Sequence, residues 1–249
     1  MSKPALRIEA LHHGFLGRPL FEDLSLEIER HELVAVMGPS GCGKSTLLNL
    51  CSGLLLPQRG KLERNYTRHA FIFQEPRLLN WLTARDNILY PIRFLTGRKS
   101  PKTIESRLET LRQLIRLEEA DLEKYPPELS GGMAQRVALA RALITNPDFL
   151  FCDEPFSALD PLLRIHLQDH LIALSRNLGF AMMFVTHDLH EAVRLAHRIL
   201  ILPMDPNQTV AAYIPDGLPG RRSDDACFAM VAELRTRSVF VDILNSVLA

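Results

Sequence analysis

The strongest indication of the fold is the stretch Gly38-Pro39-Ser40-Gly41-Cys42-Gly43-Lys44-Ser45, which has the form G-x-x-x-x-G-K-S. Closely spaced glycines let the backbone curl around a polyphosphate, a lysine reaches the outer phosphates, and a hydroxyl ligates the accompanying Mg²⁺. The apolar run Leu33–Met37 before it is typical of a buried parallel strand, and a helix follows from Thr46. That helix points the positive end of its dipole at the phosphates. This context favours a nucleotide-binding loop over an ordinary glycine-rich turn with a surface lysine.

Composition bounds the class of protein. The chain has 249 residues, of which 47% are hydrophobic and 23% charged, as in an ordinary globular protein. Lys+Arg and Asp+Glu both number 29, and this balance argues against a broad electrostatic grip on nucleic acid. No apolar stretch approaches the roughly 20 residues of a membrane span, and no secretory signal is apparent. We expect a cytoplasmic protein that meets a membrane only through a partner.

The cysteines and two of the histidines are the residues of this chain that could form disulfides or metal sites. The cysteines are scattered without a C-x-x-C pair, which predicts reduced, mostly buried thiols. His166 and His170 have the i, i+4 spacing that can bind a metal on a helix face, but exposed helices often carry such residues. No zinc site is predicted.

The order of hydrophobic patterns predicts an α/β fold. Short strands and turns are expected from Ala5 to about Met37, and further buried strands at 70–73, 149–152, 181–185 and 199–202. Between about 83 and 143 the spacing becomes helical. Strands that alternate with helices imply a parallel sheet with an inserted helical subdomain. A proline-containing tail follows, with a helical stretch from about Asp224 to the end of the chain.

Acidic residues follow one of the predicted core strands. Asp153 and Glu154 come directly after Phe149–Cys152, at the carboxyl edge where ligands of such sheets sit. Asp153 is placed to help hold Mg²⁺, and Glu154 to polarise an attacking water as a general base. The alternative is an acidic strand end that only contacts solvent, followed by a turn at Pro155. The phosphate loop in the same chain disfavours this alternative.

A second motif indicates the protein family. It is the stretch Leu129-Ser130-Gly131-Gly132-Met133-Ala134-Gln135-Arg136. Ser130, Gly131 and Gly132 begin a helix whose free N–H groups can receive an anion, although a plain helix cap has the same local sequence. The full string resembles the signature motif of ATP-binding cassette ATPases. The resemblance covers nearly the whole chain, from about Leu6 to the tail.

The resemblance implies a fold and domain organisation. It implies a P-loop NTPase (RecA-like) α/β core with a parallel sheet, an N-terminal antiparallel β subdomain and an inserted α-helical subdomain. The chain would be one ATPase domain, with the core at 1–82 and 144–205, the helical subdomain at about 83–143 and a C-terminal tail at 206–249. The ligands would be ATP and Mg²⁺.

The resemblance also assigns roles to residues. Glu154, His187 and Gln74 would be catalytic, His187 as the switch histidine and Gln74 as the Q-loop glutamine. Metal ligands would come from Ser45, Gln74 and Asp153. The nucleotide would be bound by Phe15, an aromatic placed to stack on adenine, and by the loop and signature residues Gly38, Pro39, Ser40, Gly41, Cys42, Gly43, Lys44, Ser45, Thr46, Ser130, Gly131 and Gly132. Ser157–Asp160 matches the D-loop at the dimer interface.

Below the family level, the segment from Gln74 to Trp81 resembles importer ATPases of the nitrate/sulfonate/taurine group, with Asn80 in place of a proline. This implies an ATP-hydrolysing homodimer bound to transmembrane permease subunits at the cytoplasmic face of the inner membrane, served indirectly by a solute-binding protein. An exporter ATPase, or a soluble relative acting on ribosomes or nucleic acid, remains as an alternative. Trp81 is either a docking residue for the permease or a core residue of the helical subdomain.

Overall fold

A six-stranded sheet forms the centre of the protein, in a computed structural model that describes residues 3–94 and 101–236. The strands in the middle of this sheet are fully buried, and all strands except the one at its C-terminal edge pair in parallel, as the continuous apolar runs predict. Across the sheet the strands are β5 (His69–Ile72), β6 (Phe149–Asp153), β7 (Ala181–Val185), β3 (Leu33–Met37), β8 (Arg198–Ile201) and β9 (Ala211–Tyr213).

The last of these strands was not predicted. Ala211–Tyr213 pairs antiparallel with β8, so the sheet is mixed at this edge, and the region expected to be a tail supplies a strand of the core sheet. A run of three residues is too short for hydrophobic alternation to be recognised, and the neighbouring prolines favour a loop. Pairing with β8 therefore overrides the local signal.

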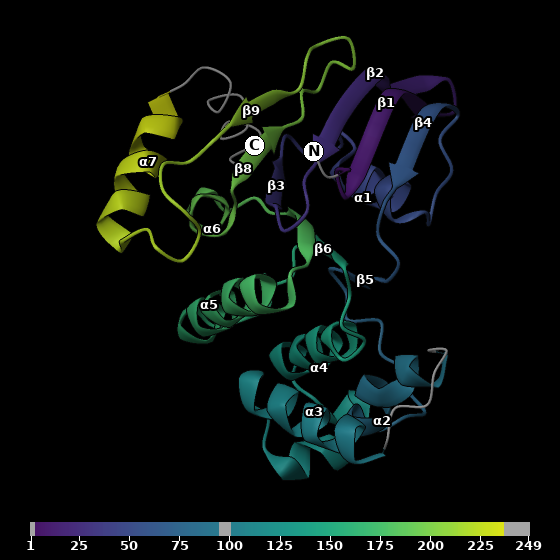
Figure 1. Cartoon of the computed structure of the whole chain (residues 1–249), viewed down its shortest axis with the longest axis vertical. Coiled ribbons are helices and arrows are strands. Elements are labelled where there is room, and N and C mark those ends of the chain that lie inside the picture. The colour runs from purple at the N-terminus through teal and green to yellow at the C-terminus, as the bar shows by residue number, and fades with distance from the viewer. Residues whose placement is uncertain (1–2, 95–100, 237–249) are drawn as a thin grey trace.

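A second, antiparallel sheet confirms the predicted N-terminal β subdomain. β1 (Leu6–Phe15) lies between β2 (Arg18–Ile28) and β4 (Arg59–Arg64) (Figure 1). One face is apolar, and it packs with α1 (Lys44–Ser52) and the middle strands of the large sheet into one buried cluster. In the β1–β2 ladder His13 stands opposite Phe21, whose ring lies under the phosphate loop.

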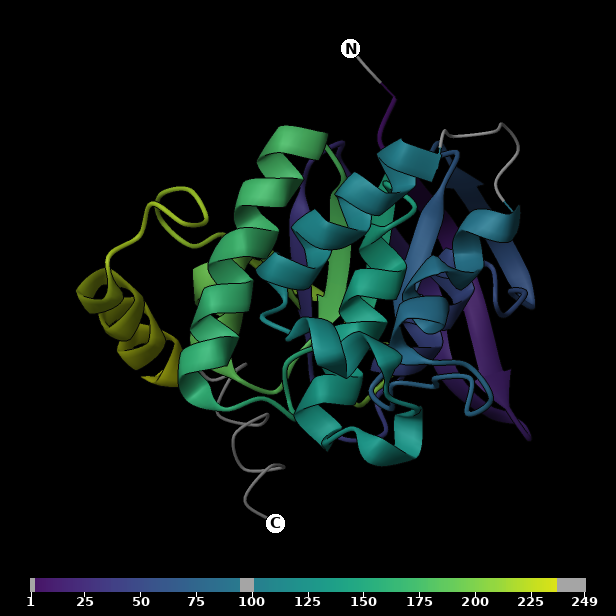
Figure 2. The same ribbon diagram turned by 90° about the horizontal axis from the view of Figure 1, so that it is seen from below.

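The predicted helical insertion forms the lower part of Figure 1, apart from the β subdomain and α1. Seen from below in Figure 2, its helices lie in front of the sheet, beside α5 (Pro161–Leu178), and α4 contacts β5. Its elements are α2 (Ala84–Leu89), η1 (Tyr90–Phe94), α3 (Pro101–Leu114), η2 (Glu119–Glu123), η3 (Pro126–Glu128) and α4 (Gly131–Leu143). α4 begins as expected: the Ser130 hydroxyl caps it by accepting a hydrogen bond from the Met133 N–H at 3.2 Å.

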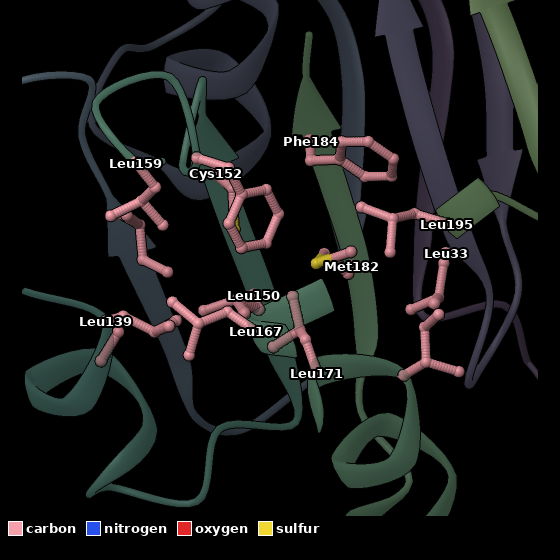
Figure 3. Close-up of a cluster of buried hydrophobic side chains, with 14 of the residues drawn as sticks. Leu33, Leu139, Leu150, Cys152, Leu159, Leu167, Leu171, Met182, Phe184 and Leu195 are labelled. Atoms are coloured by element: carbon pink, nitrogen blue, oxygen red, sulfur yellow. The ribbon is translucent and has the colours of Figure 1, made fainter. Parts of the chain in front are cut away.

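The remaining helices are α5 (Pro161–Leu178), α6 (Leu189–Leu195) and α7 (Asp224–Thr236). In Figure 3, Leu167 and Leu171 of α5 lie beside Leu150 and Met182 of the sheet, all of them buried. α7 packs on this core through Leu234 and other apolar residues, whereas Phe228 on the same helix is 63% exposed. The helical stretch was predicted to the chain end, but 237–249 lie outside the described residues.

Two further expectations concern the cysteines and membrane-spanning helices. Cys42, Cys51, Cys152 and Cys227 are all buried and free, as predicted. None of the helices within 3–94 and 101–236 combines the length and the apolar character that crossing a bilayer requires.

Candidate functional site: a phosphate loop beside a carboxylate cluster

The loop between β3 and α1 has two positions where only glycine fits, because the backbone has a positive φ and other atoms lie close to it. Gly38 has φ 155°, and a side chain there would come within 2.6 Å of the Leu202 carbonyl and 2.7 Å of the Cys42 sulfur. Gly43 has φ 99° at the N-cap of α1, against the Phe21 ring. Both glycines are therefore required for the loop to curl, and the free N–H groups at the start of α1 are left for an anion.

The side chains of the loop divide by exposure. Ser40 and Ser45 are exposed, Pro39 and Thr46 are half-buried, and Cys42 is buried beneath the backbone. Burial raises the pKa of the Cys42 thiol, although the neighbouring Lys44 ammonium opposes the shift. The thiol is thus a neutral packing group under the loop.

The side chain of Lys44 folds back onto the start of the loop. Its ammonium donates to the carbonyls of Gly38 at 2.9 Å and Pro39 at 2.8 Å. The next residue, Ser45, hydrogen bonds through its hydroxyl to the Asp153 carboxylate at the end of β6. Burial raises the pKa of Asp153, and the Ser45 hydrogen bond and the Lys44 charge act against that rise. The loop and the acidic strand end thus form one site.

The strand order explains how residues far apart in sequence meet. Gln74 follows β5, Glu154 follows β6 and His187 follows β7, and these are consecutive neighbours in the sheet. The Gln74 amide donates to one Glu154 carboxylate oxygen at 3.2 Å, and His187 Nδ1 lies 3.3 Å from the other. All three candidate catalytic residues therefore converge, with Glu154 in the middle. Its side chain is 21% exposed and that of His187 57%.

Ser130, Gly131 and Gly132 lie elsewhere in the same chain. They begin α4 in the helical insertion, whereas α1 lies in the opposite half of Figure 1. Ser130 and Gly131 are exposed, and a side chain added at Gly131 would meet no atom within 4 Å. The predicted signature residues thus form an open surface away from their own chain's phosphate loop.

Known proteins with similar sequences identify the family of this chain. The ABC transporter family model matches residues 21–157. The aliphatic sulfonates import ATP-binding protein SsuB of Bacillus licheniformis is 40% identical over 96% of this chain and 90% of its own length. SsuB 2 of Pseudomonas syringae pv. tomato is 41% identical over 90% of this chain and 93% of its own. This chain belongs to the ABC transporter family.

A solved structure agrees with the family. A dimeric ATP-binding cassette in a post-hydrolysis state, bound to ADP and Pi, superimposes with a TM-score of 0.77 at 29% identity, covering 86% of this chain and all of that one. The predicted membership of the ATP-binding cassette family is therefore confirmed. The chain is an ATP-binding cassette ATPase.

The residues of the cassette fit ATP and Mg²⁺. A glycine-lined loop with unpaired helix N–H groups and an adjacent ammonium suits a polyphosphate. The hydroxyl of Ser45 and the carboxylate of Asp153, already in contact, are the hard oxygen donors that Mg²⁺ prefers.

Phe15 lies at the end of β1, where the ladder continues from the His13–Phe21 pair. Because the Phe21 ring contacts Gly43, this hairpin lies next to the phosphate loop. Phe15 is 50% exposed, and its only described ring partner is His13, edge-on at 5.1 Å. A half-exposed aromatic ring suits stacking on a base, and the role of Phe15 at adenine stays a prediction.

Two residues that hold the site were not predicted. Arg141 of α4 donates to the carbonyls of Arg77 at 2.9 Å and Pro76 at 2.7 Å, so the segment after Gln74 is fastened to the helical insertion. Gln135, also of α4, contacts the backbone on either side of the catalytic cluster. Both act on main-chain carbonyls at long range, and no local sequence pattern signals such contacts.

The histidine pair on α5 is engaged by the protein. His166 Nδ1 lies 2.9 Å from the Arg116 guanidinium and His166 Nε2 lies 3.2 Å from the Leu114 carbonyl. His170 Nδ1 lies 2.8 Å from the carbonyl of His166. These contacts join α5 to the end of α3.

Glu191 is a buried carboxyl on α6, four residues after His187, and its pKa predicts how the stability of the protein depends on pH. It is 5% exposed, and burial, reinforced by the nearby Asp188 charge, raises its pKa from 4.5 to about 8. The folded state therefore binds a proton that the unfolded chain releases above its own pKa, so stability falls as pH rises from 4.5 to about 8. Glu191→Gln should remove this loss and stabilise the protein near pH 8 by on the order of a few kcal/mol.

Urea unfolding at pH values below 5 and above 8 measures this effect. The expected gain of the Glu191→Gln variant over wild type is largest at the higher pH and shrinks at the lower. An equal difference at both pH values would contradict a protonated buried carboxyl. Gln168→Glu is not a suitable control, because the Gln168 amide donates to Glu191 at 3.5 Å.

Proposed function

We propose that this chain is the ATP-hydrolysing subunit of an importer that takes up small sulfonates or related anions of the nitrate and taurine type. The proposal of ATP hydrolysis rests on the position of Glu154, whose carboxylate contacts both Gln74 and His187 beside the phosphate loop. Support for import comes from the relatives, which are named as import ATP-binding proteins for aliphatic sulfonates.

The candidate residues divide the work of hydrolysis. Lys44 and the N–H groups of the loop bind the phosphates of ATP, and Phe15 stacks on the base. Glu154 accepts a proton from the attacking water, and His187 contacts the terminal phosphate. Ser45, Asp153 and Gln74 would hold Mg²⁺, which neutralises charge developing on the phosphates when it is bound.

The second half of each site comes from a second copy of the chain. Ser130, Gly131 and Gly132 begin α4 in the helical insertion, apart from α1 and its phosphate loop, and their helix N-terminus is open to an anion. We therefore place them over the ATP bound to the partner's loop, with Ser157–Asp160 at the interface. Support comes from two solved neighbours, both described as dimeric cassettes.

Transport requires permease subunits in the membrane. The cassette would lie peripherally at the cytoplasmic face of the inner membrane, attached to the permease, with a solute-binding protein acting from the other side. Trp81 is 73% exposed, which overturns the alternative of a core residue of the helical insertion. It is a candidate docking residue for a permease helix, because exposed tryptophans are favoured at such interfaces.

The Trp81 loop is already ordered for docking. Asn87 is fully buried within α2. Its side chain accepts a hydrogen bond from the Leu79 N–H at 2.8 Å and donates to the carbonyls of Leu79, Leu82 and Thr83. The loop that carries Trp81 is thus fixed without a partner.

Trp81→Ala is expected to weaken binding to the permease by about 2 kcal/mol or more, roughly 30-fold in Kd, because a buried interface tryptophan would be lost. ATP hydrolysis by the isolated cassette should not change. Co-purification with the permease and ATPase assays of the free subunit check both parts. Unaltered assembly, or loss of the free subunit's activity, would contradict the docking role; Phe228→Ala on α7 serves as the exposed aromatic control.

The experiment for the whole proposal is ATP hydrolysis by the cassette reconstituted with its permease and solute-binding protein. Sulfonates, taurine and nitrate are added in turn, and one of these anions is expected to stimulate turnover. Stimulation by a solute presented from the cytoplasmic side without a binding protein would indicate export. Co-sedimentation with ribosomes and no membrane partner would overturn a transport role.

A further inference from the structure

A buried amide lies between the two polypeptide segments that carry the catalytic candidates. Gln135 is on the second turn of α4 and is 1% exposed. Its side-chain N–H₂ group lies 3.2 Å from the Pro155 carbonyl and 3.4 Å from the Phe73 carbonyl. The two N–H donors of the Gln135 amide are thus shared between two backbone carbonyls, one after β5 and one after β6.

Both acceptors adjoin catalytic candidates. Pro155 follows Glu154, and Phe73 precedes Gln74, so one side chain ties together the backbones whose own side chains meet at 3.2 Å. Glu154 has a φ of 48°, a conformation rarely adopted by residues other than glycine, which must be held by its surroundings. Other restraints on the Glu154 peptide are the Val185 carbonyl and Ser157, at 3.1 Å and 3.0 Å.

Packing alone does not explain the amide. The Gln135 carbonyl oxygen is buried with no hydrogen-bond partner, which is costly. A methionine would fill nearly the same space without that orphan oxygen. The property that only the amide supplies is its pair of donors, both directed at the carbonyls of Phe73 and Pro155.

We infer that Gln135 is a positioning residue that sets the relative placement of Gln74 and Glu154 for ATP hydrolysis, an inference that rests on the proposed catalytic roles of those two residues. Because Gln135 lies on the helix that begins with Ser130, Gly131 and Gly132, it also links the surface offered to a second subunit with the general base of its own chain. A shift of α4 on closure would reach Glu154 through this amide.

Gln135→Met should lower kcat by roughly tenfold to a hundredfold while the Kd for ATP stays unchanged, because small misplacements of catalytic groups carry losses of that order. Gln135→Glu supplies a pH readout. A buried carboxyl donates only when protonated, so this variant should gain activity relative to wild type as pH falls. The Met variant should show no such relative gain.

The controls separate positioning from folding. Gln168→Met removes an amide that is similarly buried, at 3% exposure, but lies on α5, and should leave kcat unchanged. Thermal unfolding is measured for every variant. Wild-type kcat in folded Gln135→Met would overturn the inference, as would a kcat loss in Gln168→Met of the same size.

The proposed site and this inference fail differently. If Glu154→Gln hydrolyses ATP like wild type, the general-base assignment fails whatever Gln135 does. If Glu154→Gln is inactive while both Gln135 variants are fully active at every pH, only the positioning role fails.

Discussion

Glu154→Gln is expected to lower ATP turnover by a factor of about 10²–10⁴, the usual contribution of general-base catalysis, while ATP still binds. The amide keeps the shape of the side chain and its place between Gln74 and His187, but it cannot accept the proton of the attacking water. Single-turnover hydrolysis and equilibrium ATP binding measure the two parts separately.

Glu123→Gln is the matched control, because Glu123 is an exposed carboxylate of the helical insertion. It should hydrolyse ATP at the wild-type rate. If Glu154→Gln retains wild-type turnover in single-turnover experiments, another group is the base and the assignment is wrong.

Lys44→Ala should weaken ATP binding by at least about 2 kcal/mol, roughly 30-fold in Kd, since charge-assisted hydrogen bonds to the outer phosphates are lost. The ammonium also bonds to the carbonyls of Gly38 and Pro39, so the loop itself becomes less restrained. Fluorescent-nucleotide titration gives the Kd directly, and AMP binding should be affected less than ATP binding because AMP lacks the outer phosphates.

Lys61→Ala is the control for this change, because Lys61 is exposed on β4 and pairs with Glu63. Its affinity for ATP should equal that of wild type. An unchanged Kd for ATP in Lys44→Ala would remove the basis for reading residues 38–45 as the phosphate-binding loop.

The elements with strong local signals were predictable. Buried strands such as Leu33–Met37 are continuous apolar runs, and the glycines at 38 and 43 have positive φ because the loop requires it. A helix was predicted to begin at Ser130–Gly132, and α4 begins there. These features depend on a few neighbouring residues, so sequence alone carries them.

The features that were missed depend on tertiary contacts. β9 exists because Ala211–Tyr213 finds an edge in β8, and Gln135 matters because two distant loops present carbonyls to it. The meeting of Gln74, Glu154 and His187 likewise needed the strand order β5-β6-β7, which hydrophobic patterns do not specify. Motif resemblance anticipated that meeting, but only the fold gives its distances.

In the proposed dimer, two copies of the chain enclose ATP between the phosphate loop of one and the signature helix of the other. Light scattering of Glu154→Gln measures this assembly, because slow hydrolysis should trap the closed state. With ATP the mass should double from the 28.2 kDa of one chain, and adding Ser130→Arg should return it to one chain without abolishing ATP binding. A single-chain mass for Glu154→Gln with ATP bound would contradict the claim.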